Sequence, residues 1–227
     1  MTEPRRLLLV GRGRMGRLVE SLCSDYGFEI AGCVDRAVAG SPDRWPDADV
    51  AVDFSTPDAV PMNLPRLAQR RISTVVGTTG WQAHERELRE TVAAYPVGVV
   101  AAPNFALGVN IFLVLAERAA ALAARGSFGA WIHELHHATK RDAPSGTALA
   151  LERAVRAGGF TGPVPIASTR AGSIPGTHTL GLDAAAEAIT LTHEARDRSA
   201  FARGALEAAR WVIGKRGWFS MRDVLEL

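Results

Sequence analysis

The sequence predicts an α/β fold of two domains, one built on a parallel sheet and the other, of α+β type, on an open, mainly antiparallel sheet. Over the first hundred residues, short apolar runs alternate with amphipathic stretches, which is typical of strands and helices in βαβ units. From Gly129 onward the strands are longer and alternate polar with apolar residues. With 227 residues, 47% of them hydrophobic, the chain can bury two cores.

Five apolar runs define the strands expected in the first domain. They are Leu7–Val10, Glu29–Val34, Val50–Phe54, Ser73–Val76 and Val97–Ala101. The sequence Thr56-Pro57-Asp58 supplies an N-cap, a proline at the first helical position and an acid in the first turn, so we expect a helix from about Pro57 to Arg70.

The second domain is expected to begin with a helix over the hydrophobic stretch Val109–Ala124. Strands are expected at Trp131–His137 and Ala188–His193, where apolar residues alternate with polar ones. A helix over about 145–157 begins with a serine cap and ends at two glycines. A last amphipathic helix is expected over about Ser199–Ile213.

The charge balance excludes several classes of partner. The chain has 26 basic and 24 acidic residues, a net charge of +2, and no Lys/Arg run of the kind that binds nucleic acid or a membrane surface. The apolar run Leu7–Val10 is too short for a signal peptide or a membrane span, so we expect a cytoplasmic protein. A small-molecule partner is therefore favoured.

A glycine-rich motif follows the first expected strand and opens a helix. Gly11, Gly13 and Gly16 have the G-x-G-x-x-G spacing that binds the pyrophosphate of a dinucleotide in Rossmann-type domains. These glycines permit a tight turn, a close approach of the backbone to the phosphates, and close packing of the helix on the strand. The helix N-terminus adds amide donors and a favourable dipole. The motif favours a nicotinamide dinucleotide, although methyltransferases also place a glycine loop after a first strand.

Asp35 ends the second expected strand, nineteen residues after Gly16. An acid at this position accepts hydrogen bonds from the adenosine ribose hydroxyls and favours NAD. Arg36 beside it can pair with a 2′-phosphate or stack on adenine. We therefore expect NADH to be used and NADPH to be tolerated, with an ordinary surface Asp-Arg pair as the alternative.

The segment His133–His137 matches the zinc-peptidase motif H-E-x-x-H letter for letter. In that motif the two histidines bind zinc from one face of a helix. Here glycines precede the segment and its apolar residues alternate, so we expect a strand that holds His133 and His137 about 13 Å apart. We therefore predict no metal site.

Residues with complementary chemistry cluster after this segment. His136 and His137 lie where the expected strand gives way to a loop, and Lys140 adds a positive charge. Gly146 and Thr147 begin a helix whose amides can bind an anion. A proton-transfer histidine, a lysine and an anion site together describe a site for a small carboxylate. Each residue alone is more often structural, so the prediction rests on their clustering.

A further pair of candidate residues lies later in the chain. Arg170 and His178 flank a loop that contains two glycines. A guanidinium and an imidazole placed in this way could clamp a second carboxylate or could merely turn a corner. The residues themselves leave both interpretations open.

Six parts of the sequence together resemble the dihydrodipicolinate reductase family, whose members are also named 4-hydroxy-tetrahydrodipicolinate reductases. They are Gly13–Gly16, Gly77–Gly80, Ala102–Phe105 with Gly108–Asn110, Glu134–Thr147, Arg170–Gly172 with His178, and Phe201–Leu206. The resemblance covers nearly the whole chain in order. It implies an NADH- or NADPH-dependent reduction of 4-hydroxy-tetrahydrodipicolinate, a small dicarboxylate, to tetrahydrodipicolinate in the diaminopimelate route to lysine.

The resemblance also implies roles for individual residues. His136 would be the proton donor and acceptor and Lys140 a proton donor. The substrate-binding candidates are His137, Gly146, Thr147, Arg170 and His178. The cofactor-binding candidates are Gly11, Arg12, Gly13, Arg14, Met15, Gly16, Asp35, Arg36, Gly77, Thr78, Thr79, Ala102, Pro103, Asn104 and Phe105.

Members of this family are typically homotetramers, so the resemblance implies a homo-oligomer. It also implies that residues 1–106 and 198–227 form the dinucleotide-binding domain and residues 107–197 the substrate-binding and oligomerisation domain. Only fourteen residues separate Asp35 from Val50, where members typically have a longer stretch. This segment borders the expected adenosine pocket, which leaves the preference between NADH and NADPH open.

Two alternative functions are compatible with the sequence. One is another two-domain NAD(P)-dependent dehydrogenase that acts on an amino-acid-derived carboxylate. The other is a non-catalytic protein that senses a dinucleotide. A sensor would not need His136, His137 and Lys140 together beside a helix cap, which argues against it.

Overall fold

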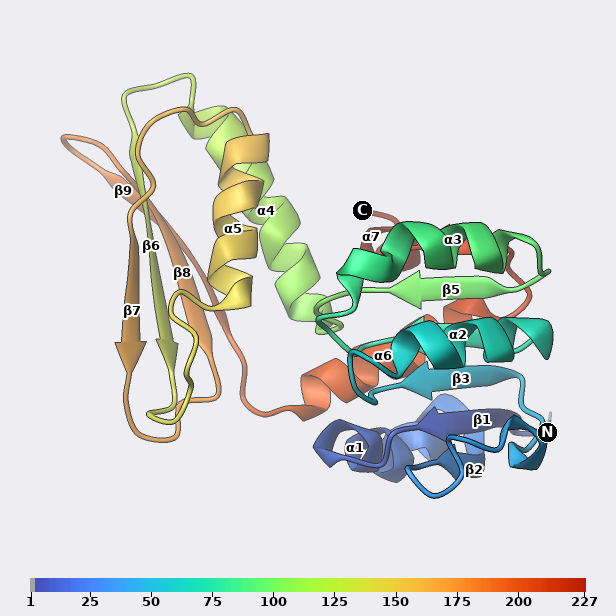
Figure 1. The fold of residues 1–227 in the computed structure, drawn as a ribbon. Coiled ribbons are helices and arrows are strands. Elements are labelled where there is room, and N and C mark those ends of the chain that lie inside the picture. Colours follow the sequence, from blue (N-terminus) through green and yellow to red (C-terminus); the bar gives the residue numbers. More distant parts are fainter. Residues whose placement is uncertain (1–2) are drawn as a thin grey trace. The chain divides into compact units, whose positions relative to one another are not determined.

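The structure is a computed structural model and describes residues 3–227. Its internal contacts divide the chain into two units. The first unit contains the residues up to Ala106 together with Ser199–Glu226, and the second contains Leu107–Arg198. Each unit has its own sheet and its own apolar core (Figure 1).

The first unit is built on a six-stranded parallel sheet in the order β10-β5-β4-β3-β1-β2 (Figure 1). Its strands are β1 (Arg5–Val10), β2 (Phe28–Val34), β3 (Val50–Asp53), β4 (Ser73–Val76), β5 (Gly98–Ala101) and β10 (Gly217–Phe219). The five expected strands are confirmed, and β10 adds a sixth from near the C-terminus. Since β1 lies between β2 and β3, the strand order reverses there, and ligands of open α/β sheets bind at such a switch point.

Helices cover both faces of this sheet. On one face lie α1 (Arg14–Leu22) and α6 (Ser199–Val212), and on the other α2 (Val60–Gln69) and α3 (Glu85–Ala93). Because most of the buried residues of α6 are alanine or glycine, this helix can lie close to the sheet. The remaining elements are α7 (Met221–Leu225) and three short 3-10 helices at Cys23–Tyr26, Pro42–Arg44 and Gln82–His84.

The helix expected to begin at Pro57 begins later, at Val60. The amides of Ala59 and Val60 first bond to the carbonyl of Thr56, which makes a turn before the helix, and Ala59 is the N-cap. A second proline, Pro61, occupies the first helical turn, where its missing N–H costs no intrahelical bond. A proline does lie in the first turn of the helix, as predicted, but it is Pro61 and not Pro57.

The second unit has a four-stranded sheet in the order β7-β6-β8-β9 (Figure 1). Its strands are β6 (Gly129–His136), β7 (Ile166–Arg170), β8 (Thr177–Asp183) and β9 (Ala188–Glu194). Only β7 runs parallel to its neighbour. The expectation of an open, mainly antiparallel sheet is therefore confirmed.

Two helices, α4 (Leu107–Ala123) and α5 (Gly146–Ala157), cover one face of this sheet (Figure 1). Their core includes Ile132 and Leu180 from the strands and Leu151 from α5. In the part of this unit that the structure describes, no helix covers the opposite face, on which Trp131 and Thr190 are exposed. No helix among the described residues is long and apolar enough to cross a membrane.

Candidate active site

The glycine loop after β1 has the geometry that a dinucleotide phosphate requires. Gly11 has a φ of 87°, and a Cβ there would lie 2.6 Å from the carbonyl oxygen of Phe54. A Cβ on Gly16 would lie 2.1 Å from the carbonyl oxygen of Gly11. A Cβ on Gly13, in contrast, would meet no atom within 4 Å. Gly11 and Gly16 are therefore required because a side chain there would collide with the backbone of this protein. Gly13 instead leaves open space beside the loop, which a bound phosphate would need.

A cavity of about 520 Å³ lies at the switch point of the parallel sheet. Five predicted cofactor residues line it: Gly11, Arg12, Gly13, Asp35 and Arg36. The other lining residues are Val10, Arg17, Val34, Ala39, Phe54, Ser55, Thr56, Ala59 and Asn63. The remaining predicted cofactor residues lie on α1 or follow β4 and β5 and do not line this cavity. Its position is the one at which open α/β sheets of this kind bind the phosphates and adenosine of a dinucleotide.

The charged residues of this cavity differ in how firmly they are held. The guanidinium of Arg12 donates to both carboxylate oxygens of Glu20, at 3.0 and 2.9 Å. One Asp35 oxygen accepts the amide of Ala37 at 2.9 Å. Arg17 also lines the cavity, and the sequence interpretation missed it. Its place four residues after Gly13, in the first turn of the expected helix, was the available signal.

Asp53 is a second residue that the sequence interpretation missed. It is 1% exposed at the end of β3 and accepts hydrogen bonds from the Ser55 amide and hydroxyl, from the Thr78 hydroxyl and from the Asn63 amide group. Burial raises the pKa of its carboxyl group, while these hydrogen bonds oppose that shift. Through these hydrogen bonds, Asp53 connects the loop after β3 to the loop after β4. Its only signal in the sequence was the presence of an acid at the end of an apolar strand.

The predicted cofactor residues after β4 and β5 serve partly as packing residues. A Cβ on Gly77 would overlap the Phe54 ring, and that ring packs edge-on against Phe105. Thr78 is buried, whereas Thr79 and Pro103 are exposed. The side-chain oxygen of Asn104 accepts the amide of Ala106, and Ala102 is nearly buried. All of these residues lie at the carboxyl edge of the sheet, where the glycine loop also lies.

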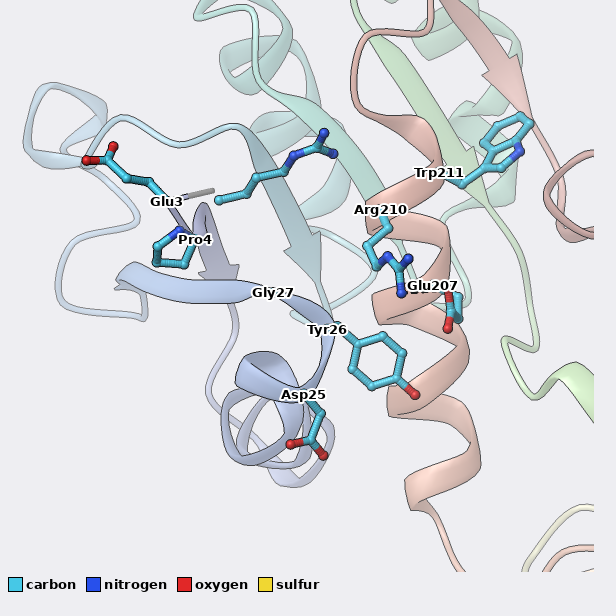
Figure 2. A pocket seen from close by; sticks show the side chains of 9 residues that line it. Glu3, Pro4, Asp25, Tyr26, Gly27, Glu207, Arg210 and Trp211 are labelled. Atoms are coloured by element: carbon cyan, nitrogen blue, oxygen red, sulfur yellow. Dashed lines mark ion pairs between the residues drawn. The ribbon is translucent and has the colours of Figure 1, made fainter. Parts of the chain in front are cut away.

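A larger cavity, of about 890 Å³, lies at the opposite edge of the parallel sheet (Figure 2). It is lined by Arg5 at the start of β1, by residues before β1 and β2, and by Glu207, Arg210 and Trp211 of α6. None of the predicted site residues lines it. Because ligands of such sheets bind at the carboxyl ends of the strands, its size alone does not make it the cofactor site.

The H-E-x-x-H segment is a strand, as expected, and not a helix. Glu134 and His136 lie on the buried face of β6, whereas His133 lies on the other face and contacts the Thr169 hydroxyl at 3.0 Å. His137 follows the end of the strand, and its Nδ1 lies 2.8 Å from the Thr139 hydroxyl. The geometry of a helical zinc-peptidase motif is therefore not formed by this segment.

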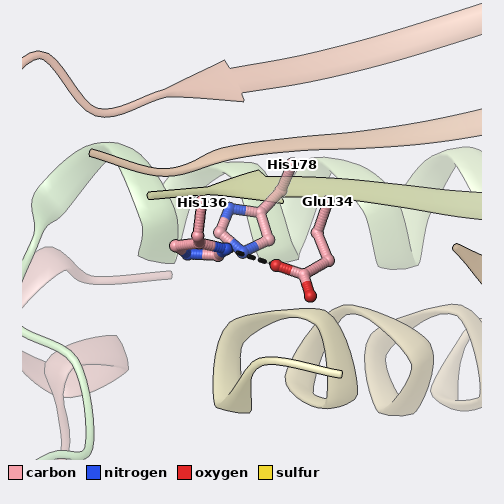
Figure 3. Close-up of side chains that lie close together, drawn as sticks. All are labelled: Glu134, His136 and His178. Carbon is pink, nitrogen blue, oxygen red and sulfur yellow. Dashed lines mark hydrogen bonds and ion pairs between the residues drawn. The ribbon is translucent and has the colours of Figure 1, made fainter. Parts of the chain in front are cut away.

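A buried network joins Glu134 to His136 beside His178 (Figure 3). Nδ1 of His136 is hydrogen-bonded to Oε2 of Glu134. Oε1 of Glu134 accepts the Arg170 guanidinium at 2.6 Å and the Ser145 amide at 3.3 Å. Glu134 is 0% exposed, so the sequence interpretation, which gave it no role, missed the centre of this cluster. Its inward position in a strand of alternating burial was the signal, since a buried charge must be paired.

The ionisation states of this network follow from burial and pairing. Burial disfavours the charged carboxylate of Glu134, but hydrogen bonds from Arg170 and Ser168 prevail and lower its pKa to about 2. Burial lowers the pKa of His136, and the Glu134 carboxylate partly opposes this shift. Burial and the neighbouring His136 lower the pKa of His178 to about 4. Glu134 is therefore charged and His178 neutral near pH 7.

His178 also adjoins the start of α5. Its Nε2 lies 3.1 Å from the Ser145 hydroxyl, and that hydroxyl caps the helix by accepting the Ala148 amide. Gly146 and Thr147 are the first two residues of α5, at the positive end of the helix dipole. A Cβ on Gly146 would meet no atom within 4 Å. The helix start is therefore accessible to a ligand and suited to an anion.

Lys140 lies in the loop between β6 and α5. Its Nζ donates to both carboxylate oxygens of Asp142, at 2.7 and 2.9 Å. This hydrogen bond lowers the pKa of Asp142. Because Asp142 is exposed, the pair is of the weak, exchangeable kind that a bound anion can replace.

Ligand atoms of Glu134, His136 and His178 lie within 4.8 Å of one another, a spacing that a metal ion could use. However, Arg170 and the Ser145 amide already occupy one oxygen of Glu134 as donors. A guanidinium 2.6 Å from this oxygen also opposes a second cation. We retain the prediction of no metal, now for this trio as well as for His133 and His137.

The fold and the two groups of residues define a class of protein. A glycine loop at the switch point of a parallel sheet is where Rossmann-type domains bind the phosphates of a dinucleotide. The other unit holds a buried histidine, a lysine and a helix N-terminus, which suit proton transfer to a small anion. The class is a two-domain NAD(P)-dependent oxidoreductase.

Comparison with known proteins identifies the family. The model for "Dihydrodipicolinate reductase, N-terminus" matches residues 5–105, and that for "Dihydrodipicolinate reductase, C-terminus" matches residues 108–225. The chain belongs to the dihydrodipicolinate reductase family, a family of NAD(P)H-dependent reductases of lysine biosynthesis. The resemblance found in the sequence is thereby confirmed.

Relatives match along their whole length. A 4-hydroxy-tetrahydrodipicolinate reductase of Rhodopseudomonas palustris (strain TIE-1) is 38% identical over 270 residues, covering 100% of this chain and 99% of its own. The enzyme of the same name from Granulibacter bethesdensis is 42% identical, covering 94% of this chain and 93% of its own. The first alignment is longer than the 227 residues of this chain, so the Rhodopseudomonas relative carries insertions.

Solved structures show the same fold at lower sequence identity. The dipicolinate-bound dihydrodipicolinate reductase of Paenisporosarcina sp. TG-14 superposes with a TM-score of 0.79 at 22% identity, covering 96% of this chain and 97% of its own. A probable dehydrogenase of Thermotoga maritima gives a TM-score of 0.60 at 11% identity, with coverages of 96% and 92%. The predicted fold class is confirmed.

Proposed function

We propose that this protein reduces 4-hydroxy-tetrahydrodipicolinate to tetrahydrodipicolinate with NADH or NADPH, as the names of its relatives indicate. The observation that carries the proposal is the buried Glu134–His136 pair beside the start of α5, in a chain that also has a glycine loop at the switch point of its parallel sheet. When bound, the nicotinamide supplies the hydride. The residues of this chain bind the dicarboxylate and supply the proton.

Substrate binding is assigned to the start of α5 and its neighbours. A carboxylate of the substrate can accept hydrogen bonds at the N-terminus of α5, which begins at Gly146 and Thr147 and where the dipole favours an anion. His137 and Lys140 lie in the loop that leads from β6 to this helix, and their side chains can add hydrogen-bond donors. His178 and Arg170 remain candidates by resemblance, and both are tied to this region through Ser145 and Glu134.

Proton transfer is assigned to His136 and Lys140. Nδ1 of His136 is bonded to Glu134, which leaves Nε2 as the ring atom for proton exchange. A Cβ on residue 176 would lie 3.0 Å from this Nε2, so the glycine found there keeps the atom uncrowded. Lys140 holds a proton on Nζ next to Asp142 and can present it to a bound dianion when the ion pair opens.

The preference between the two cofactors is assigned to Asp35 and its neighbours. The carboxylate of Asp35 suits ribose hydroxyls and repels a 2′-phosphate, whereas Arg36 and Arg17, which line the same cavity, attract one. We propose that NADH is used and that NADPH is tolerated.

We further propose a homotetramer that works in the cytoplasm. The uncovered face of the β7-β6-β8-β9 sheet exposes Trp131, an apolar side chain that an interface between copies of the chain would bury. Cys23 and Cys33 are free thiols, as is usual in a reducing compartment. Sedimentation of the wild type and of Trp131→Glu tests the assembly, because a charge on this face should shift the protein to smaller species.

One assay tests the proposed activity. The purified protein is mixed with NADH or NADPH and the freshly made condensation product of pyruvate and aspartate semialdehyde, and cofactor oxidation is followed by absorbance. Oxidation that requires this product supports the proposal. Cofactor binding without oxidation would instead support a dinucleotide sensor, and oxidation with another amino-acid-derived carboxylate only would support a different dehydrogenase.

A further inference from the structure

The guanidinium of Arg170 makes three hydrogen bonds to residues of its own domain. Nη2 donates to Oε1 of Glu134 and to the carbonyl oxygen of Asp142, both at 2.6 Å, and Nη1 donates to the carbonyl oxygen of Thr169 at 2.9 Å. Both bidentate faces of a guanidinium include Nη2, whose two hydrogens are used here. Arg170 therefore cannot clamp a carboxylate bidentately while it keeps these contacts.

The partners of Glu134 fix the direction of each hydrogen bond. Arg170 and the Ser145 amide can only donate, so Oε1 must accept. A charged carboxylate is an acceptor at both oxygens, so Oε2 must accept as well, and the hydrogen must lie on Nδ1 of His136. The neutral imidazole then has its lone pair on Nε2.

We propose that Glu134 and Arg170 are positioning residues: their ion pair holds His136 as the Nδ1–H tautomer, so that Nε2 is the ring atom that exchanges the proton. The proposal rests on the proposed role of His136 in proton transfer. It gives Arg170 a role other than that of a substrate ligand. The same carboxylate bonds the Ser145 amide, and thus sets the start of α5 in register with the His136 ring.

Glu134→Gln gives a direct test, because an amide is an acceptor on one side only. Its oxygen must face the two donors, Arg170 and Ser145, so its NH2 group faces Nδ1 of His136 and requires that nitrogen to accept. The variant should therefore reverse the tautomer to Nε2–H. The readout is the pair of ring ¹⁵N shifts of His136, assigned by their loss in His136→Gln and measured at a pH where the ring is neutral.

The matched control is Glu152→Gln, which removes a partly exposed carboxylate that pairs with Arg156 in the same domain. It should leave the His136 tautomer and kcat unchanged. The double variant Glu134→Gln/Arg170→Met removes both charges of the pair together. Only the Ser145 amide then directs the Gln oxygen, so His136 should be a mixture of the two tautomers. If Glu134→Gln fails to fold, a purely Nδ1–H tautomer in the double variant would overturn the proposal.

Kinetics provide a second, independent readout. Arg170→Met should lower kcat by about 10- to 10⁴-fold, the range found when a group that orients a catalytic residue is lost, and should leave KM for the dicarboxylate within about threefold. A tenfold or larger rise in KM with normal kcat would make Arg170 a substrate ligand and overturn the proposal. An unchanged His136 tautomer in Glu134→Gln would overturn it too. Since the tautomer is measured without turnover, it remains informative even if the wild type does not reduce the proposed substrate.

Discussion

The two sites of this chain are built from different materials. The glycine loop after β1 is made mainly of backbone, and its sequence is constrained because positions such as Gly11 and Gly16 have no room for a side chain. The cluster around Glu134 is made of charged and polar side chains, each with a specified partner. A backbone site should tolerate changes in its side chains but not the addition of a Cβ. A side-chain site should fail when one partner is lost.

The largest expected effect lies in the side-chain site. His136→Gln and Lys140→Ala should each lower kcat by about 10²–10⁴-fold, because general acid catalysis typically contributes that much. The Kd for NADH, measured by fluorescence titration, should stay nearly unchanged, since neither residue belongs to the glycine-loop unit. Near-normal turnover in both variants would mean that the cluster is not catalytic.

Adding one methyl group at two positions tests the backbone site. Gly16→Ala should destabilise the first unit by about 1–3 kcal/mol, because its Cβ would lie 2.1 Å from the Gly11 carbonyl oxygen. Gly13→Ala should leave the unfolding midpoint unchanged but weaken NADH binding, because its Cβ would enter the open space in which we propose that the phosphate binds. Calorimetry and NADH titration of both variants give the result. Normal NADH affinity in Gly13→Ala would place the pyrophosphate elsewhere.

The buried histidines should make the stability of the second unit depend on pH. The folded pKa of His178, about 4, lies below its ordinary value of 6.5, so the folded state disfavours the proton. Its stabilising contribution is complete above pH 6.5 and is lost as the pH falls from 6.5 through 4, up to about 3 kcal/mol. Urea unfolding at pH 7.5 and 4.5 measures this loss.

His178→Asn is the control for this pH effect. It should show a smaller loss of stability between the two pH values, although His136 and His193, whose pKa values burial also lowers, still contribute with the same sign. Glu134 acts at lower pH, because its folded pKa of about 2 lies below its ordinary 4.5, so its contribution is lost only as the pH falls through that interval. An identical pH dependence in wild type and variant would contradict the assignment to His178.

A smaller effect is expected from Asp35, a side chain at the edge of the backbone site. Asp35→Ala should raise KM for NADH and improve the use of NADPH, shifting the ratio of their kcat/KM values by about tenfold, the equivalent of 1.4 kcal/mol. The reason is the loss of repulsion toward a 2′-phosphate while Arg36 and Arg17 remain. An unchanged ratio would mean that the adenosine end does not lie beside Asp35.

Chelation should have no effect at all. Zinc binding is expected neither at His133 and His137 nor at the trio of Glu134, His136 and His178. The first pair does not lie on one face of a helix, because His133 is part of a strand, and in the trio the negative charge of Glu134 is already paired with Arg170. Elemental analysis should find no stoichiometric zinc, and treatment with a chelator should leave reductase activity intact. One zinc per chain together with loss of activity on chelation would overturn the proton-transfer mechanism.

The sequence by itself determined the features that are local. Three features could be predicted: the bounds of the strands near the glycine loop, the serine cap of α5, and the strand that contains the H-E-x-x-H letters. Each depends on spacing, capping or alternation over a few residues. The family could also be identified, because its motifs run in order along the chain. Even local signals were misplaced where two compete, as with Pro57 and Pro61 before α2.

Only the tertiary structure decided which side chains meet. Glu134 and Arg170 are 36 residues apart in sequence and lie 2.6 Å apart in space, because β7 pairs with β6 in a particular register. Asp53 reaches Thr78 because β4 lies beside β3. A local pattern predicts which face of a strand is buried, but it does not say which strand lies beside it, so the partner of a buried charge cannot be read from the sequence alone. The roles of Glu134 and Arg170 therefore follow from the pairing of strands and not from the order of residues.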